Sequence, residues 1–415
     1  MIKKIYTNNI IYIFLDSFFA LIRVAILSKY IGVVGFGEIA IIQNLANLLN
    51  LFTPRSGDIF IKYASENKKN FYQISLILNF ILITLNVIIG SFIFLLIAIN
   101  SPTIYNNNID KALFLLGIPI FFFNTISNQI APVLRFHNKS PQSSKNMMIG
   151  TLISSILIFS LYLIDNLNVF TSLLSLSLSS ASVAFLMLFS LKDCVKIDKN
   201  FFDKDFGKKF KLVFKSNYFY NLFQATLTGI LKSGGEMGAI FILGSLGSAK
   251  EVGIYNLARQ SLKPLTLTQS GIQQVFFPEF MKEIVSTKNI KIRKKIREFI
   301  LKSTFILSLL GLPYIFISSK LVNIWVPGIE NSINIVIPIL FFSYLISFLS
   351  LPFYPLALKL NLLSSRNKIS SLKYMFLLGV IIYGNANAVL LSIVTLLGSL
   401  LVRLCFDLRL FKSLR

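Results

Sequence analysis

Apolar residues run in blocks of about 20 from one end of the chain to the other, and short polar segments separate the blocks. A helix of that length crosses the hydrocarbon core of a bilayer. The blocks predict about twelve transmembrane helices, of which the eleventh is short. They lie at 8–29, 37–61, 72–99, 112–134, 147–164, 169–191, 217–246, 252–278, 299–320, 333–358, 372–384 and 387–408.

The basic residues between these blocks assign the two sides of the membrane. With a cytoplasmic N-terminus, most of the 41 Lys and Arg fall in or beside cytoplasmic segments. The opposite side receives only Lys29, Lys111, Lys250 and Lys320. Cytoplasmic loops of membrane proteins carry an excess of Lys and Arg, and one missed helix would exchange the sides downstream. We therefore expect a multi-pass protein with both termini in the cytoplasm.

The composition supports a membrane protein and argues against a nucleic-acid-binding protein. The 415 residues are 54% hydrophobic and 14% charged, with a mean hydropathy of +0.71, values that a soluble globular protein does not have. The formal net charge of +24 would indicate nucleic-acid binding in a soluble chain. Here the basic residues lie in short loops, where orientation in the membrane explains them. We expect no nucleic-acid partner.

The longest charged connector lies at the middle of the chain and divides six predicted helices from six. It contains eight Lys and four Asp. We expect an N-terminal lobe at 1–191, a cytoplasmic linker at 192–215 and a C-terminal lobe at 216–415. The predicted fold is an all-α integral membrane protein made of two six-helix lobes.

Two short motifs recur across that midpoint and indicate that the lobes are repeats. The turn between the first two helices contains Gly32 and Gly37, and the turn between helices 7 and 8 contains Gly247 and Gly253. Helix 4 ends in PVLRFHN, and helix 10 ends in PLALKLN. The interface of two such bundles is the expected place for a substrate.

Charged residues inside the spans are the main candidates for a site. A charge at the centre of a membrane helix costs about 2.5 to 3.5 kcal/mol, so it persists only where it faces protein or a water-filled cavity. We expect the basic residues of helices 1, 2, 7 and 8 to line a cavity between the lobes. They are Arg23, Arg55, Lys232, Arg259 and Lys263.

Three acidic residues, Asp16, Asp58 and Glu236, lie in the same helices. Each is a candidate to bind a coupling proton or sodium ion, and a structural ion pair with a neighbouring base is an equally good interpretation. The sequence leaves both open.

The glycine turns, repeated between the halves, and the basic residue that closes helices 4 and 10 resemble the O-antigen (Wzx-type) polysaccharide flippases. These belong to the multidrug/oligosaccharidyl-lipid/polysaccharide (MOP) exporter superfamily, which also holds the multidrug and toxin extruders (MATE). The resemblance covers essentially the whole chain through its architecture. It implies a V-shaped transporter of the bacterial inner (cytoplasmic) membrane. By alternating access, it would move an undecaprenyl-diphosphate-linked oligosaccharide to the periplasmic leaflet for O-antigen or capsule synthesis.

The resemblance also gives the five basic residues a role, because relatives line their cavity with basic residues in these helices. A diphosphate crossing a low-dielectric medium needs Lys or Arg to replace the water that it leaves. The sugar would need amides, which here are expected at Asn44, Asn47 and Gln224. Hydrogen bonding between helices is the alternative role for each amide. The implied partners are the lipid-linked oligosaccharide, membrane lipids and other polysaccharide-assembly membrane proteins.

Two other functions are alternatives to polysaccharide transport. A cation-coupled multidrug extruder of the same fold should show more acids than bases in its cavity, whereas these helices hold more bases. A polysaccharide polymerase should carry a large external loop, which the predicted spans leave no room for. The cysteines, Cys194 and Cys405, and the single His137 suggest neither disulfide nor metal, and no phosphate-binding loop is present. We expect a non-enzymatic protein without a cofactor.

Overall fold

The computed structural model describes most of the chain, and every regular element in the described part is a helix. The described residues are 2–52, 56–65, 69–100, 109–192, 194, 217–266, 277, 280–281, 289–383 and 386–413. Of the linker predicted at 192–215, only Lys192 and Cys194 are among them. The domain boundaries therefore remain a prediction.

Helices occupy each of the twelve predicted spans within the described ranges, which confirms the all-α membrane fold. The first half contains α1 (Ile2–Leu51), α2 (Ser56–Ser65), α3 (Lys69–Ile99), α5 (Lys111–Leu115), α6 (Gly117–Phe136), α7 (Ser140–Leu163) and α8 (Val169–Lys192). The second half contains α10 (Tyr218–Leu246), α11 (Ala249–Ser261), α13 (Asn289–Trp325), α14 (Glu330–Leu349), α15 (Phe353–Lys359), α16 (Leu363–Ser371), α17 (Lys373–Tyr383), α18 (Ala388–Val402), the π-helix η2 (Arg403–Asp407) and α19 (Leu408–Ser413).

Eight helices in the described part are long and apolar enough by themselves to cross a bilayer. This number is below twelve because α1 combines two spans, because α11 and α17 are short, and because only Met237–Leu246 of α10 counts as an apolar helix. The difference is one of helix continuity, and the number of crossings agrees with the prediction.

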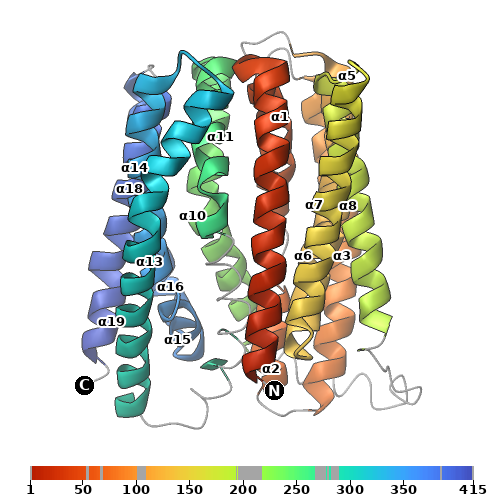
Figure 1. Cartoon of the computed structure of the whole chain (residues 1–415). Coiled ribbons are helices and arrows are strands. Elements are labelled where there is room, and N and C mark those ends of the chain that lie inside the picture. Colours follow the sequence, from red (N-terminus) through yellow and green to blue (C-terminus); the bar gives the residue numbers. More distant parts are fainter. Residues whose placement is uncertain are drawn as a thin grey trace.

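The helix α1 combines two spans because its backbone reverses at Gly32. This glycine has φ 78° and ψ 176°, a conformation that a residue with a Cβ atom rarely adopts. An ascending limb, 2–31, leaves the end of the bundle that carries both termini, and a descending limb, 33–51, returns toward α2 at that same end (Figure 1). The predicted glycine turn is therefore a tight connection between two antiparallel helices.

The motifs at the ends of helices 4 and 10 adopt the same backbone conformation. Asn138 has φ 59° and Asn361 has φ 57°, the left-handed region in which Asn is tolerated better than most residues. Each is followed by a closing hydrogen bond, from the Lys139 N–H to the Leu134 carbonyl at 2.9 Å and from the Leu362 N–H to the Ala357 carbonyl at 2.8 Å. The internal repeat predicted from sequence is therefore present in the backbone.

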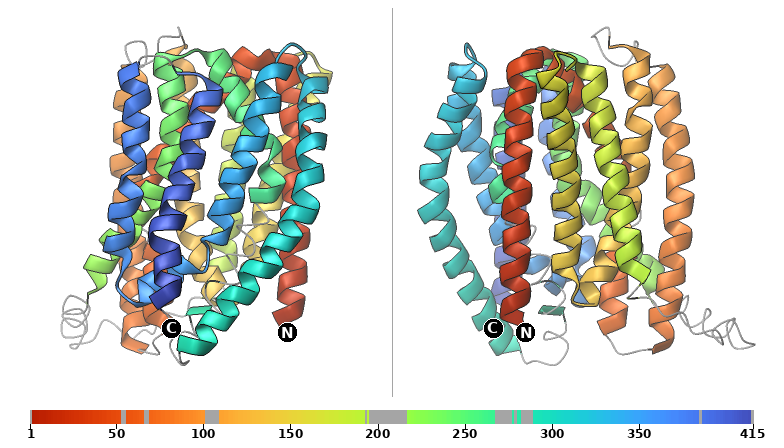
Figure 2. Two further views of the ribbon diagram at one scale, coloured as in Figure 1. Left: turned by 90° about the vertical axis from the view of Figure 1, so that its left-hand side faces the viewer. Right: turned by 45° about the vertical axis from the view of Figure 1, so that its right-hand side comes forward.

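The two halves stand side by side around α1, α10 and α11. Figures 1 and 2 show α3, α6, α7 and α8 on one side of the bundle and α13, α14, α18 and α19 on the other. The helix α1 packs on α7 of its own half and on α11 of the other half. Both chain termini lie at one end of the bundle, here called the terminal end (Figure 1).

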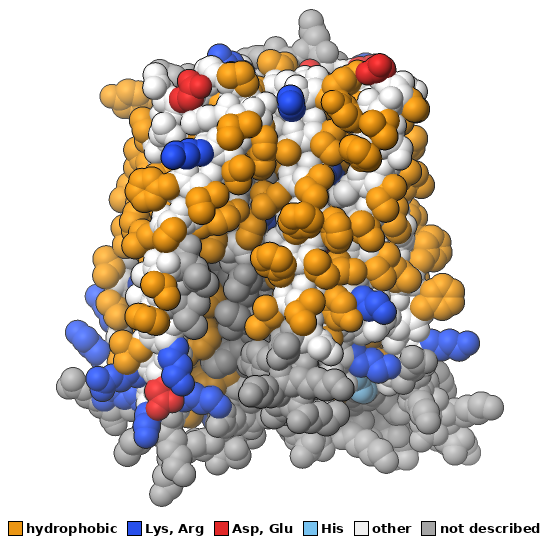
Figure 3. Space-filling model, in the orientation of Figure 1, with side chains coloured by type: hydrophobic (Ala, Val, Ile, Leu, Met, Phe, Trp, Pro, Cys, Tyr) orange, Lys and Arg blue, Asp and Glu red, His pale blue; other side chains and the backbone are white. Residues whose placement is uncertain are grey.

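A broad apolar surface surrounds the bundle, as expected for a protein in lipid. The face in Figure 3 shows hydrophobic side chains over its middle and most of its Lys and Arg toward the terminal end. Large apolar side chains such as Phe189, Phe316 and Ile382 are 73%, 72% and 84% exposed. This surface makes the chain a multi-pass membrane protein.

Candidate functional site

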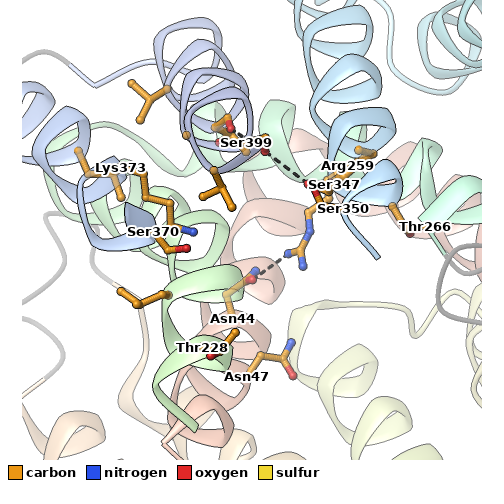
Figure 4. Close-up of a pocket in the computed structure, with 18 of the residues that line it drawn as sticks. Asn44, Asn47, Thr228, Arg259, Thr266, Ser347, Ser350, Ser370, Lys373 and Ser399 are labelled. Carbon is orange, nitrogen blue, oxygen red and sulfur yellow. Dashed lines mark hydrogen bonds between the residues drawn. The ribbon is translucent and has the colours of Figure 1, made fainter. Parts of the chain in front are cut away.

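A cavity of about 520 Å³ lies between the two halves of the bundle. The helix α1 supplies its wall from the first half, and residues of α10, α11 and α14 to α18 supply the wall from the second half (Figure 4). Among the described lining residues there are basic side chains and no acidic ones. The basic residues are Arg23, Arg259, Lys263, Arg366 and Lys373. A cavity of this size is in the range of small-molecule sites.

Both limbs of α1 face the cavity. Arg23 comes from the ascending limb, and Gln43, Asn44 and Asn47 come from the descending limb. The last three share one helix face because residues three and four apart lie one above another. Two of the three amides predicted as sugar contacts, Asn44 and Asn47, therefore lie in the cavity wall.

The helix α11 and the residues that directly follow it bring a second polar stripe to the cavity, from the second half of the chain. Asn256, Arg259, Gln260 and Lys263 follow one another at helical spacing and all line it. The start of this helix is fixed by Ser248, whose Oγ accepts the Glu251 N–H. The Glu251 carboxylate accepts the N–H of Ala388 at the start of α18 at 2.8 Å. These contacts set the position of α11 against the rest of the second half.

Arg259 and Asn44 connect the two halves across the cavity. The Arg259 Nη1 donates to the Asn44 Oδ1 at 3.1 Å, and the Asn44 Nδ2 donates to the Ala40 carbonyl at 2.7 Å (Figure 4). The second bond holds the amide with its oxygen toward the guanidinium. This amide is a neutral hydrogen-bond acceptor, and it orients the Arg259 guanidinium at the cavity wall.

Arg23 is also held by a neutral partner. Its Nη1 donates to the Ser154 Oγ on α7 at 2.7 Å. Lys263 lies near enough to Arg23, Arg259 and Asp16 for all three charges to act on it. We call Arg23, Arg259 and Lys263 the central cations. Among the charges that act on Lys263 in the described part of the chain, two are positive and one, Asp16, is negative.

Asp16 is buried at 8% exposure on the ascending limb of α1. Its Oδ1 has no hydrogen-bond partner among the described residues. The alternative of an Asp16–Arg23 ion pair is not realised within this described part, since Arg23 bonds to Ser154 instead. Whether Asp16 binds a coupling ion stays a prediction.

Four other predicted site residues cannot be placed in or out of the cavity. Arg55 lies outside the described residues, as do the side chains of Asp58, Lys232 and Glu236. Gln224 is described, and it is buried against α16, where its Oε1 accepts the Asn367 Nδ2 at 2.9 Å. It is not among the described lining residues, so the alternative role of hydrogen bonding between helices fits it better than sugar contact.

Two basic residues of the cavity were missed by sequence reasoning. Arg366 lies in the predicted loop before the eleventh span and Lys373 at the first residues of that span, where the sequence pattern is that of a basic cytoplasmic loop. The sequence signal that could have found these two residues is their helical spacing. Arg366, Ser370, Lys373 and Leu377 repeat at intervals of four and three along α16 and α17, and all four line the cavity.

The two halves also meet at both ends of the bundle. Away from the terminal end, a Cβ on Gly37 would overlap the Ala249 carbonyl oxygen, and a Cβ on Gly253 would overlap that of Val33. These repeat-related glycines therefore let the two backbones touch. At the terminal end, the Lys62 Nζ on α2 donates to the Leu358 carbonyl and the Asn361 Oδ1 at 3.3 Å each.

Comparison with known proteins identifies the fold. The sequence matches no protein-family profile and no curated protein. Solved structures match over the whole chain. A MATE transporter in complex with MaL6 is 13% identical with a TM-score of 0.66, covering 100% of this chain and 97% of that one. A mutant of the Vibrio cholerae MATE transporter VcmN is 13% identical with a TM-score of 0.67, covering 100% and 96%.

A third structure of the same fold is a MOP superfamily transporter from Pyrococcus furiosus. It is 14% identical with a TM-score of 0.65 and covers 100% of this chain and 96% of that chain. For that transporter, the reverse polarity of the binding pocket suggests a different function. The chain therefore has the MATE-like fold, and at this identity the likeness concerns the fold alone.

Proposed function

We propose that this MATE-like protein transports an undecaprenyl-diphosphate-linked oligosaccharide repeat unit from the cytoplasmic to the periplasmic leaflet of a bacterial inner membrane. The observation that carries the proposal is the charge of the cavity. Its described lining contains five basic side chains and no acidic one. A cavity with this excess of positive charge favours an anionic substrate.

Phosphate groups fit the central cations for a physical reason. A diphosphate loses much of its hydration when it enters a cavity of low dielectric constant, and paired Lys and Arg side chains replace that hydration with charge-assisted hydrogen bonds. Arg23 and Arg259 donate to Ser154 and Asn44, which are uncharged. These bonds orient both guanidinium groups at the cavity wall, where a phosphate can reach them.

The remainder of the lining suits a carbohydrate. Amides at Gln43, Asn44, Asn47, Asn256 and Gln260 offer donors and acceptors to sugar hydroxyls. The volume accommodates a diphosphate and sugar rings, whereas a long prenyl chain belongs in the apolar phase of the bilayer. This division matches a substrate with a polar head and a lipid tail.

In an alternating-access cycle, the contacts at the two ends of the bundle would break in turn. Opening the cavity toward the terminal end separates Lys62 from Leu358 and Asn361, and opening it toward the other end separates Gly37 and Gly253 from the facing backbone. With both termini in the cytoplasm, as the loop charges predict, the first opening admits substrate and the second releases it in the periplasmic leaflet. Surface polysaccharide, such as O-antigen or capsule, is the product that such transport serves.

A cation-coupled multidrug extruder is the alternative, because one structure of the same fold is described as that of a MATE multidrug transporter. A cationic drug requires acidic residues in the cavity. Asp16 is the only acid that the described residues bring near the central cations, and it is outnumbered there. The charge balance thus favours the anionic substrate.

Purified protein in liposomes tests the proposal. We expect translocation of a fluorescent prenyl diphosphate oligosaccharide, and we expect Arg259→Gln or Lys263→Gln to reduce the rate by about tenfold or more, the effect of losing one charge-assisted hydrogen bond. Lys302→Gln, at an exposed position on α13, is the matched control. Full transport with both central cations neutralised, or faster transport of a cationic dye than of the diphosphate, would contradict the proposal.

A further inference from the structure

The cavity has a second group of cations on the wall opposite Arg259. Figure 4 shows Lys373 reaching inward from the side of the cavity that faces Arg259. Lys373 begins α17, and Arg366 lies seven residues earlier on α16. Two helical turns separate them, and both line the cavity. We call this pair the eleventh-span cations, and the central cations include neither of them.

Arg366 is held in place by two contacts. Its Nε lies 3.8 Å from the Asp407 Oδ1, and its guanidinium lies 5.8 Å from the ring centre of Tyr354, within the range of a cation–π contact. Asp407 is fully buried and also lies 4.0 Å from the Arg403 Nη1. One carboxylate stands between two guanidinium groups and cannot neutralise both. These three described residues, Arg366, Arg403 and Asp407, together carry a net positive charge beside the cavity.

Lys373 is accommodated by two glycines on neighbouring helices. A Cβ on Gly235 of α10 would lie 3.0 Å from the Lys373 Nζ, and a Cβ on Gly398 of α18 would lie 3.0 Å from the Lys373 Cβ. Larger residues at either position would displace this side chain. The two glycines thus leave room for Lys373 to extend from α17 into the cavity, where its Nζ lies 5.4 Å from the ring centre of Tyr374, within the range of a cation–π contact.

We propose that Arg366 and Lys373 form a second oxyanion subsite, which binds an acidic group on the glycan while the central cations bind the diphosphate. This inference rests on the proposed function and narrows its substrate class to lipid-linked oligosaccharides that carry a negative charge on a sugar. Phosphate groups of one diphosphate are adjacent and occupy one wall. An anionic substituent on a sugar ring reaches the other wall.

The chemistry common to such substituents is an oxyanion, supplied by the carboxylate of a hexuronic acid or by a phosphate ester on a sugar. Arginine and lysine bind either one through charge-assisted hydrogen bonds. The neighbouring hydroxyl of Ser370, also in the cavity wall, adds a neutral contact. A neutral oligosaccharide brings no anionic group to the eleventh-span cations.

Binding measurements on the full-length protein in nanodiscs test this inference. The probes are three short-chain prenyl diphosphate disaccharides whose outer sugar is a hexose, a hexuronic acid or a hexose phosphate. We expect the wild type to bind at least one acidic probe about tenfold more tightly than the neutral one, the effect of one charge-assisted hydrogen bond. The acidic probe that shows the preference identifies the source of the oxyanion.

Variants of Lys373 test whether the second subsite causes the tighter binding of the acidic probe. Lys373→Gln should lower the ratio of acidic to neutral affinity to near one, and Lys373→Arg should restore part of it. Lys302→Gln, on the outer surface, should leave the ratio as in the wild type, and size-exclusion profiles show that each variant is folded.

The outcomes separate this inference from the proposed function. Equal affinity of the wild type for all three probes overturns the second subsite and leaves the diphosphate site standing. A preference that persists in Lys373→Gln also overturns it. Failure of every probe to bind overturns the proposed function, and the second subsite with it.

Discussion

The basic residues of the cavity differ in their hydrogen-bond and ion-pair partners. Arg23 and Arg259 donate to a serine and an asparagine, and these neutral partners position the two guanidinium groups at the cavity wall. Arg366, in contrast, shares the buried Asp407 with Arg403. The sequence predicted that Arg23, Arg259 and Lys263 line one cavity, since charged residues inside apolar spans must face protein or water, and all three lie in the cavity wall. Their role in binding stays a prediction.

Asn44 offers a test of charge against hydrogen bonding at the central cations. Asn44→Asp places a carboxylate against the Arg259 guanidinium, and we expect it to weaken binding of a prenyl diphosphate by about tenfold or more. Asn44→Ala removes the acceptor but leaves the cavity's charge, so its effect should be only a few-fold. Titration of both variants in nanodiscs checks this order. Equal losses would show that the shape of the amide matters and its neutrality does not.

At the scale of helices, the backbone contacts of the repeat motifs explain why glycines occupy their turns. Gly32 reverses the chain inside α1. Gly37 and Gly253 serve a different purpose, since each touches the backbone of the opposite half. The sequence showed the repetition of these glycines, but a contact between the two copies depends on how the halves dock and cannot be read from either motif alone.

Alanine at Gly37 or Gly253 should open the end of the bundle away from the termini. The added methyl group overlaps a backbone carbonyl oxygen of the other half, and backbone cannot move aside without separating the halves. Spin labels at Lys29→Cys and Lys250→Cys, both exposed in the structure, with Cys194 and Cys405 replaced by Ser, measure this separation.

We expect a longer interlabel distance in Gly37→Ala and Gly253→Ala than in the unsubstituted protein. Gly379→Ala on α17 is the matched control, because a Cβ there meets nothing within 4 Å. An unchanged distance distribution in both interface variants would mean that these glycines do not hold this end closed.

For the whole molecule, the apolar surface and the shared end of both termini fit a protein that crosses the membrane an even number of times. The predicted side of the membrane follows from loop charge and can be tested separately. Lys29 lies near the reversal at Gly32, and Lys294 lies on α13 near the terminal end, and both are exposed.

Cysteine labelling in intact cells checks this orientation. In a protein with Cys194 and Cys405 replaced by Ser, a membrane-impermeant maleimide should label Lys29→Cys directly. Lys294→Cys should be labelled only after permeabilisation, because the terminal end carries the basic loops expected in the cytoplasm. The reverse pattern would invert the direction of the proposed transport.

The sequence alone determined the class of fold, the number of crossings and the repeat, because bilayer thickness sets helix length and charge is costly in lipid. It also indicated central cations in helices 1 and 8. The tertiary structure decided which charges share a cavity. Arg366 and Lys373 lie where the sequence pattern is that of a cytoplasmic loop, and Gln224 lies in a polar span yet bonds to Asn367. The rotation of each helix about its axis is set by packing against its neighbours, which hydropathy does not record.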